Sequence, residues 1–416
     1  MEKTKNRWLI ALSAVGIHLS IGSVYAWSVF TNPLIDQYGW SLSYVSLTFS
    51  IAILFLGLSA AFMGHFVEKH GPRRSGIVSA AFFGIGMMAS GGAAALESIW
   101  LLYVTYGVLA GIGLGIGYIT PVSTLIKWFP DRRGLATGLA IMGFGFSAMI
   151  ASPIMAGLIE SVGIPFTFLI LGIVYFVIMM ASALYLERPP VGYMEDFMEE
   201  KKKVPDLSQL TANEAVKTRR FWLLWVMLFI NITCGIAILS VASPIAQEIA
   251  GLSAGAAATM VGLMGFFNGA GRIAWASVSD YLGRPNVYTM FFFIQIVAFF
   301  ALPGITHALL FQAVLFLIIS CYGGGFASVP AYIGDLFGTK QLGAIHGYIL
   351  TAWAAAGLVG PLLVSWIRGA TESYVLTLSI FGITLIAALL VSLWIRVDMK
   401  QLKQRSEQQA VQKLSS

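Results

Sequence analysis

The stretch GHFVEKHGPRR, residues 64–74, joins two apolar runs of the chain, and the shorter stretch DYLGR, residues 280–284, joins two later ones. Each stretch carries an acid, Glu68 or Asp280, followed three residues later by a glycine and then by arginine. The two acids are 212 residues apart, and so are the two glycines. An acid–glycine–basic turn that recurs at one offset predicts that the second half of the chain repeats the fold of the first.

Other positions extend this repeat along the chain. A proline in the fourth apolar run recurs in the tenth, and the Gly-x-x-x-Gly pair that follows the fourth run recurs after the tenth, all at an offset of 209 residues. The matched residues are Pro121 and Pro330, Gly134 and Gly343, and Gly138 and Gly347. Because each half holds an even number of apolar runs, the two copies should have the same orientation.

The composition indicates that lipid is the solvent of these runs. Hydrophobic residues make up 58% of the 416 residues and charged residues only 11%, whereas a soluble domain has about 25% charged residues. The 44 glycines suit helices that pack closely in a bilayer. The net charge of +6 resides in short loops, which indicates membrane topology rather than nucleic-acid binding. Cys234 and Cys321 lie in apolar runs and indicate neither disulfides nor a metal site.

A membrane span needs roughly 20 apolar residues, and the sequence contains twelve such runs. We expect an all-α integral membrane protein with two six-helix bundles, residues 1–187 and 221–396. A linker rich in charge, residues 188–220, separates them, and residues 397–416 form a tail. The predicted helices are 8–30, 43–64, 75–95, 99–126, 134–158, 166–186, 221–246, 254–278, 286–304, 308–333, 342–366 and 373–396.

The basic residues predict the orientation in the membrane. With the N-terminus in the cytoplasm, all but two of the 25 Lys and Arg fall on the cytoplasmic side. The exceptions are Arg272, inside the eighth helix, and Arg368, in an outer loop. This bias follows the positive-inside rule. We therefore expect a monomeric, multi-pass protein of the cytoplasmic (inner) membrane, with an uncleaved first helix and with both termini and the linker in the cytoplasm.

The acid–glycine–basic turn resembles the best-known motif of the major facilitator superfamily, with Glu68 in place of the usual Asp. The resemblance covers the whole chain and implies the twelve-helix fold of that superfamily. It also implies that the turns latch the cytoplasmic side, where a short turn holds an acid near helix ends and basic loop groups. The residues that this interpretation assigns to gating are Glu68, Gly71, Arg73, Asp280, Gly283 and Arg284.

Further stretches resemble the oxalate/formate antiporter family and the related monocarboxylate transporters. Each stretch is weak by itself, but together they occur in order and at matching helices. They imply that the cargo is a small organic anion. The stretches are Gly22–Phe30, Lys127–Gly138, Phe221–Trp225, Gly271–Arg272 with Asp280–Arg284, and Asp335–Gly338.

Arg272 is the residue that we expect to bind this anion. An arginine within a span costs roughly 2.5–3.5 kcal/mol on insertion scales, it stays protonated, and no Asp or Glu lies deep in a predicted span. A guanidinium matches a carboxylate in a bidentate fork. In the resembling families an arginine at this place binds the substrate carboxylate. The alternative is that Arg272 extends to the cytoplasmic surface or bonds helix-end carbonyls.

One buried cation balances one carboxylate. The resemblance implies that oxalate carriers place a lysine in helix eleven beside the arginine, and alignment on Gly347 puts Trp353 there. This favours a monocarboxylate such as lactate, pyruvate or formate over oxalate. Asn268, one turn before Arg272, stands where the animal monocarboxylate transporters have a proton-carrying acid. It orients the guanidinium or bonds a substrate hydroxyl, and the alternative is a helix–helix hydrogen bond.

Aromatic residues are the candidates for the rest of the substrate cavity. They are Tyr118 in helix four, Tyr322 and Phe326 in helix ten, and Tyr25 and Trp27 in helix one. The tyrosines offer hydroxyl groups to a carboxylate, and Phe326 offers contact to a short alkyl group. The alternative for each residue is helix packing. For Tyr25 and Trp27, a position at the membrane interface is a further alternative.

His18, in the middle of the first helix, is the candidate for proton coupling. A lone histidine in a span is more often a hydrogen-bonded packing residue, and this alternative stays open beside the first. The carrier of a proton would otherwise be a protonated substrate or an acid near a helix end.

The sequence contains no phosphate-binding Gly-x-x-x-x-Gly-Lys loop and no zinc-spaced His and Cys set. We therefore expect no enzyme, no catalytic residue, no metal and no cofactor. We expect a secondary active transporter that moves a monocarboxylate by alternating access, through proton symport or anion exchange. The alternatives are oxalate/formate-type dicarboxylate exchange, an exporter of drugs or apolar compounds, a regulatory membrane protein and a passive channel.

Overall fold

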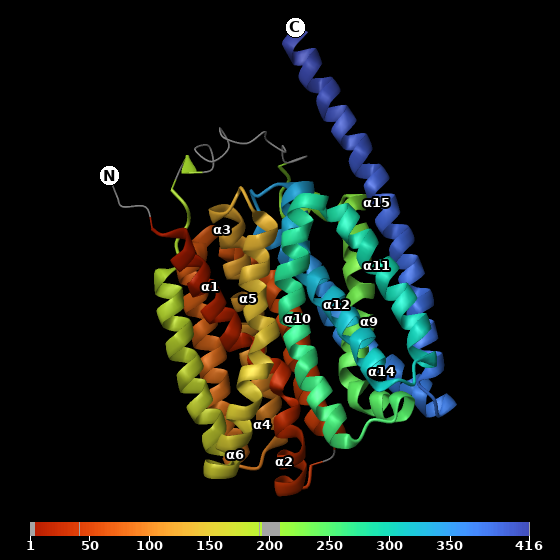
Figure 1. The fold of residues 1–416 in the computed structure, drawn as a ribbon. Coiled ribbons are helices and arrows are strands. Elements are labelled where there is room, and N and C mark those ends of the chain that lie inside the picture. The colour runs from red at the N-terminus through yellow and green to blue at the C-terminus, as the bar shows by residue number, and fades with distance from the viewer. Residues whose placement is uncertain (1–4, 41, 191, 194–208, 416) are drawn as a thin grey trace.

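The computed structural model describes residues 5–40, 42–190, 192–193 and 209–415, and every regular element in these ranges is a helix. The helices form two groups that stand side by side (Figure 1). The first group ends with α6 and the second begins with α9. Helix α1 begins and helix α15 ends at the same end of the molecule, which we call the terminal end (Figure 1). The other end is called the opposite end.

The first group contains the helices up to Tyr185. The first apolar run is interrupted by a 3-10 segment, and the fourth contains a π-helical segment after its first helical turn. The elements are α1 (Arg7–Ile21), η1 (Gly22–Ala26), α2 (Ser28–Tyr38), α3 (Leu42–Ala95), α4 (Ile99–Leu102), η2 (Tyr103–Ala110), α5 (Gly111–Trp128) and α6 (Arg133–Tyr185).

The second group follows a short helix, α8 (Ala212–Ala215), which a capping box of Thr211 and Glu214 begins. Residues 191 and 194–208, about half of the predicted linker, lie outside the described residues. The remaining elements are α9 (Arg219–Ala250), α10 (Ala254–Leu282), α11 (Arg284–Ala301), η3 (Leu302–Gly304), α12 (Ala308–Phe337), α13 (Leu342–Ile349), α14 (Thr351–Thr371) and α15 (Val375–Ser415).

Glycines with left-handed φ angles divide the long helices into spans. Helix α3, with 54 residues, breaks at Gly71 (φ 82°, ψ 171°), and α6, with 53 residues, breaks at Gly163 (φ 79°, ψ 170°). Gly283 (φ 82°, ψ 141°) makes the equivalent turn between α10 and α11. Residues with a side chain rarely adopt such φ angles. The repeated turn glycine of the sequence is therefore a backbone requirement in both halves.

Ten helical stretches among the described residues are long and apolar enough to cross a membrane. One of them, Leu47–Ala95, contains the break at Gly71 and is long enough for two crossings. Helix α10, with 29 residues, also has the length of a span but is rich in small and polar residues. The result is the arrangement of twelve spans that the sequence predicts.

Several helices differ from their predicted extent, and the first apolar run, for example, continues through α2 to Tyr38 instead of ending at residue 30. The eleventh span, Leu342–Arg368, is present as predicted, but a turn at Leu350 divides its helix into α13 and α14. The twelfth does not end at residue 396, because α15 continues to Ser415. The apolar run does end there, but the following Lys, Gln and Glu residues are good helix formers. Hydropathy therefore predicted the position of the twelfth span correctly but made its helix too short.

The two groups meet closely toward the terminal end. A Cβ atom added at Gly347 of α13 would lie 1.9 Å from the backbone oxygen of Ala60 in α3. One added at Gly134 of α6 would lie 2.2 Å from the backbone oxygen of Ala276 in α10. Because such distances exclude a side chain, glycine permits backbones of the two groups to touch. Toward the opposite end, Cβ atoms at Gly262 and Gly265 of α10 would meet open space.

Candidate functional site

Arg272 of α10 lies at the contact between the two groups and is fully buried. Its Nε donates to the side-chain oxygen of Asn268 at 3.0 Å, and its Nη1 donates to the backbone oxygen of Ile141 in α6 at 3.3 Å. Its Nη2 is buried without a hydrogen-bond partner among the described residues. A buried donor that lacks a partner costs about 1–3 kcal/mol, and more when it is charged.

No acid in the described part of the chain forms an ion pair with Arg272. Asp280, two turns later in α10, pairs instead with Arg284 at 2.5 Å. The alternative that Arg272 extends to the cytoplasmic surface is wrong, because its side chain is fully buried. The alternative that Arg272 bonds helix carbonyls holds in part, because its Nη1 donates to the backbone oxygen of Ile141 in α6. The guanidinium therefore keeps a free edge and an uncompensated charge.

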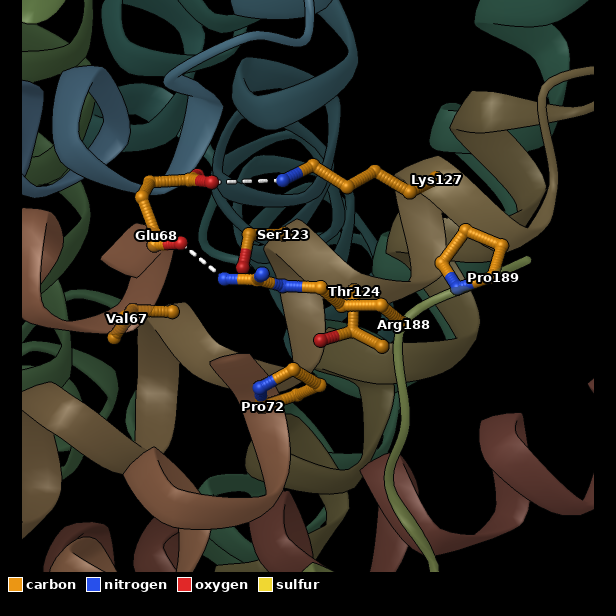
Figure 2. Close-up of a pocket in the computed structure, with 8 residues that line it drawn as sticks. All are labelled: Val67, Glu68, Pro72, Ser123, Thr124, Lys127, Arg188 and Pro189. Atoms are coloured by element: carbon orange, nitrogen blue, oxygen red, sulfur yellow. Dashed lines mark hydrogen bonds and ion pairs between the residues drawn. The ribbon is translucent and has the colours of Figure 1, made fainter. Parts of the chain in front are cut away.

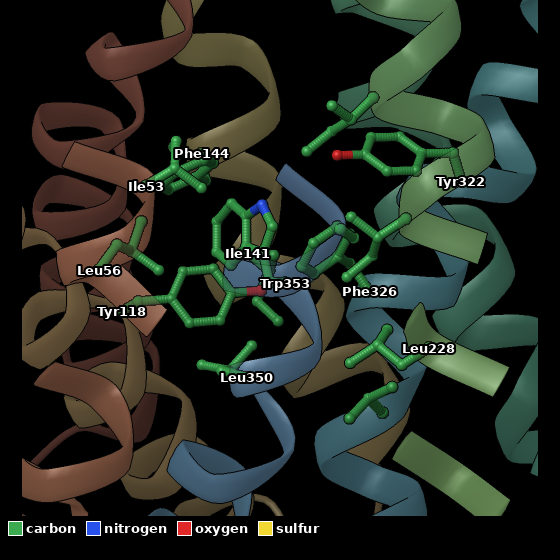
Figure 3. Packing of buried hydrophobic residues seen from close by; sticks show 14 of the residues in the cluster. Ile53, Leu56, Tyr118, Ile141, Phe144, Leu228, Tyr322, Phe326, Leu350 and Trp353 are labelled. Carbon is green, nitrogen blue, oxygen red and sulfur yellow. The ribbon is translucent and has the colours of Figure 1, made fainter. Parts of the chain in front are cut away.

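Aromatic rings surround this guanidinium. The centroids of Phe144 and Phe326 lie 5.6 Å and 5.3 Å from its Cζ, within the range of a cation–π contact. The ring of Trp353 lies 4.7 Å from that of Phe326 and 5.2 Å from that of Tyr118. Figure 3 shows Trp353 between these two rings. We call the set the aromatic box, and its members are Tyr25, Tyr118, Phe144, Tyr322, Phe326 and Trp353.

The aromatic box also presents polar groups. The hydroxyls of Tyr25 and Tyr322, from opposite groups of helices, lie 3.4 Å apart. Nε1 of Trp353 has no hydrogen-bond partner in the described ranges. The Tyr118 hydroxyl has none of ordinary geometry there either, although Arg272 is close enough to interact with it. Buried N–H and O–H groups normally have partners. Several donors that lack them, beside a cation, suit an anionic ligand.

Most of the predicted substrate residues come together, but Trp27 does not enter the box, and neither does His18, the candidate for proton coupling. The Trp27 ring packs at a tilt against that of Tyr106 inside the first group, with the ring centroids 4.4 Å apart. His18 lies behind Tyr118, with its ring nitrogens 2.5 Å and 3.1 Å from the backbone oxygens of Ala140 and Tyr118. Asn268 bonds Arg272, as one interpretation expected.

Phe144 is a member of the box that sequence reasoning missed. It contacts Tyr25, Tyr118 and Trp353, and its ring lies beside the guanidinium. The available signal was its place between Gly143 and Gly145. Glycines in a membrane helix indicate that other helices pack closely against it, and a large ring between them projects into that contact.

The acids of the repeated turns bind helix N-termini across the contact between the groups. Oε1 of Glu68 accepts from the backbone N of Gly343 at 2.6 Å, at the start of α13. Asp280 accepts from the backbone N of Gly134 at 2.8 Å and from that of Leu135 at 2.9 Å, at the start of α6. A carboxylate at a helix N-terminus is stabilised by the free N–H groups and the helix dipole. Each half therefore caps a helix of the other.

Basic residues complete this latch, which we define as Glu68, Asp280 and their partners. Lys127 donates to Oε2 of Glu68 at 2.8 Å, and Arg188 donates to its backbone oxygen (Figure 2). Arg284 pairs with Asp280 and with Asp335. Arg73 lies apart, because it pairs with Glu187 of its own group at 3.6 Å and is half exposed. Of the four charged residues that were predicted for gating, Arg73 alone has no described bond to the latch.

We expect Glu68→Gln to open the terminal end more often. The change removes the ion pair with Lys127 and the charge that caps α13, and hydrogen bonds to charged groups contribute about 1.5–3 kcal/mol. A cysteine placed at Ser123, which is buried behind Gly343, should therefore react with a maleimide about tenfold faster in this background. Glu160→Gln, an exposed site on α6, is the control and should not change the rate.

Comparison with known proteins agrees with this architecture. The sequence pattern of the Major Facilitator Superfamily matches residues 11–361. The chain therefore belongs to this superfamily and is a multi-pass membrane transporter. The E. coli fucose:proton symporter has the same fold, with a TM-score of 0.71 at 14% identity over 93% of this chain and 99% of that one. The human organic anion transporter gives a TM-score of 0.74 at 12% identity, over 93% and 100%.

Relatives found by sequence similarity have higher identity to this chain than these solved structures do. The oxalate:formate antiporter of Oxalobacter formigenes is 29% identical over 85% of this chain and 83% of that protein. The apicoplast pyruvate carrier 1 of Toxoplasma gondii is 25% identical over 85% and 83%. Monocarboxylate transporter 14 of Mus musculus is 22% identical over 92% and 88%. The two families that the sequence resembles are thus represented among these relatives.

Proposed function

We propose that this chain carries a small monocarboxylate, of the lactate, pyruvate or formate class, across the cytoplasmic membrane by alternating access. The observation that carries the proposal is the free Nη2 of Arg272, buried among the donors of the aromatic box. A carboxylate would accept from this N–H and offset a buried charge that no described acid pairs. Two relatives whose names state a pyruvate or monocarboxylate cargo support the same class.

The charge of the site supports one carboxylate rather than two. Arg272 is the one Lys or Arg of the described residues whose cation contacts a ring of the aromatic box. Trp353, in the helix where oxalate carriers are expected to have a lysine, offers a neutral N–H. A second carboxylate would enter without a second cation, and burying an unpaired charge is costly.

The contacts between the groups support alternating access. The latch and the glycine contacts hold the groups together at the terminal end, whereas α10 faces open space toward the opposite end. Separation of the same contacts would open the terminal end and close the other. By the positive-inside rule, we propose that the terminal end faces the cytoplasm.

The coupling is proposed as proton symport or anion exchange. His18 remains the candidate for a proton site, because a neutral imidazole has one donor and cannot donate to both carbonyls that its nitrogens approach. Protonation would provide the second donor. Exchange driven by a second anion would need no such residue, and the dependence of uptake on a proton gradient separates the two.

Oxalate/formate-type exchange is the second candidate, because the relative with 29% identity carries that name. It needs an additional cation in the site, which the aromatic box among the described residues does not provide.

Thermal-shift measurements with lactate, pyruvate, formate, oxalate and acetate test the proposal. A ligand at a hundred times its Kd stabilises a protein by about 2.7 kcal/mol. We expect one or more of the three monocarboxylates to raise the Tm and to drive counterflow in proteoliposomes. A response to oxalate alone would favour the second candidate, and no response to any acid would contradict the proposal.

A further inference from the structure

His346 of α13 is a buried polar residue that the proposed function does not use. The side chain is fully buried, and neither Nδ1 nor Nε2 has a hydrogen-bond partner among the described residues. An imidazole carries at least one N–H in every protonation state. A buried N–H group normally has a hydrogen-bond partner, and the described contacts provide none for His346.

The position of His346 is between the latch and the aromatic box. It follows Gly343, which bonds Glu68, by three residues, and precedes Trp353 of the box by seven. At 1.5 Å per helical residue these separations are about 5 Å and about 10 Å along the axis. Its ring centroid lies 5.8 Å from that of Tyr118. Tyr118 thus contacts Trp353 at 5.2 Å and His346 at 5.8 Å.

His346 also lies at the boundary between the two groups of helices. Tyr118 belongs to α5 of the first group, and the next residue of α13, Gly347, touches the backbone of Ala60 in α3. His18 of α1 is near, but its two ring nitrogens approach backbone carbonyls and it does not bond His346. Opening the terminal end would separate α13 from α3 and α5. His346 would then line the way from Arg272 to that end.

We propose that His346 is a second binding residue for the substrate carboxylate, used after the anion has left Arg272 and while the terminal end is open. Its N–H would donate to a carboxylate oxygen in that state. The inference rests on the proposed function, because it takes the cargo to be a carboxylate held first by Arg272. It assigns His346 to transit and not to binding in the state described here, where its one described ring contact with the box is with Tyr118.

The variants His346→Phe and His346→Gln test this role, with pyruvate as the probe or whichever acid the thermal-shift series identifies. Phe fits an aromatic, apolar site and removes the unpaired polar group, so the Tm should equal or exceed that of the wild type. Affinity for the acid should change by less than about twofold, whereas counterflow should fall by about tenfold, the effect of one hydrogen bond to a charged group. Gln keeps an N–H donor and should restore most of the rate.

A stable Phe variant with wild-type counterflow would overturn the inference, and so would a Gln variant as slow as the Phe variant at equal Tm. If the Phe variant does not fold, His346→Leu compared with His346→Gln decides the same question. The two proposals fail differently. An unchanged affinity in Arg272→Gln contradicts the proposed function, whereas loss of affinity there with normal counterflow in the His346 variants contradicts only this inference.

Discussion

Arg272→Gln is expected to abolish carboxylate binding and to lower counterflow by about a hundredfold. The guanidinium is fully buried and its Nη2 has no hydrogen-bond partner among the described residues, so a carboxylate there would form a desolvated charge pair. Truncating one partner of such a pair costs about 2–5 kcal/mol, and about 2.7 kcal/mol is a hundredfold. Counterflow in proteoliposomes and thermal shifts with the same acid measure the two effects.

Two controls make this result specific. Arg272→Lys keeps the charge but not the planar fork, so it should retain a part of the affinity. Arg368→Gln removes an arginine whose partner is the partly exposed Glu248, and transport should be unchanged. Wild-type counterflow in a folded Arg272→Gln protein would contradict the assignment of an anion to this site.

Gly347→Ala is expected to prevent full closure of the terminal end and to lower counterflow by about tenfold or more. The added Cβ would lie 1.9 Å from the backbone oxygen of Ala60, a rigid atom of the other group. Overpacking of a close contact costs about 1–3 kcal/mol, and here the strain is relieved by separating α13 from α3. A cysteine at Ser123 should become more reactive as the closed state loses population.

The matched control is Gly265→Ala in α10, where a Cβ meets nothing within 4 Å. Both changes convert a helical glycine to alanine, so they gain helix propensity alike. Gly265→Ala should therefore transport at the wild-type rate with a Tm at least as high. Equal rates in the two variants would show that the contact between Gly347 and Ala60 does not limit closure.

The repeat was readable in the sequence, but its consequence was not. The offset of 212 relates Glu68 to Asp280, and the offset of 209 relates Gly134 to Gly343. In the structure each acid bonds the glycine of the other half, Glu68 with Gly343 and Asp280 with Gly134. The repeat shows which residue of one half corresponds to which residue of the other half. The contacts between the halves join residues that do not correspond, such as Glu68 and Gly343. Those pairs follow only from how the halves face one another.

The site was also only partly readable. Arg272 stood out because a charge inside an apolar run is energetically costly. Aromatic residues carry no such signal, since they pack helices as often as they line cavities. Trp27 and Phe144 show the result: the first was expected near the substrate and lies inside its own group, and the second was not expected and lies beside the guanidinium.

By itself the sequence determined the class of fold, the two halves, and the one residue whose charge needs a partner, because hydropathy, repeat spacing and the cost of burying a charge are properties of local sequence. The tertiary structure decided which rings enclose Arg272, which helix each acid caps, and that His346 lacks a hydrogen-bond partner in the part of the chain that the structure describes. These depend on how helices distant in the sequence approach one another. That approach is set at a few glycines, such as Gly347, whose importance appears only when the neighbouring backbone is known.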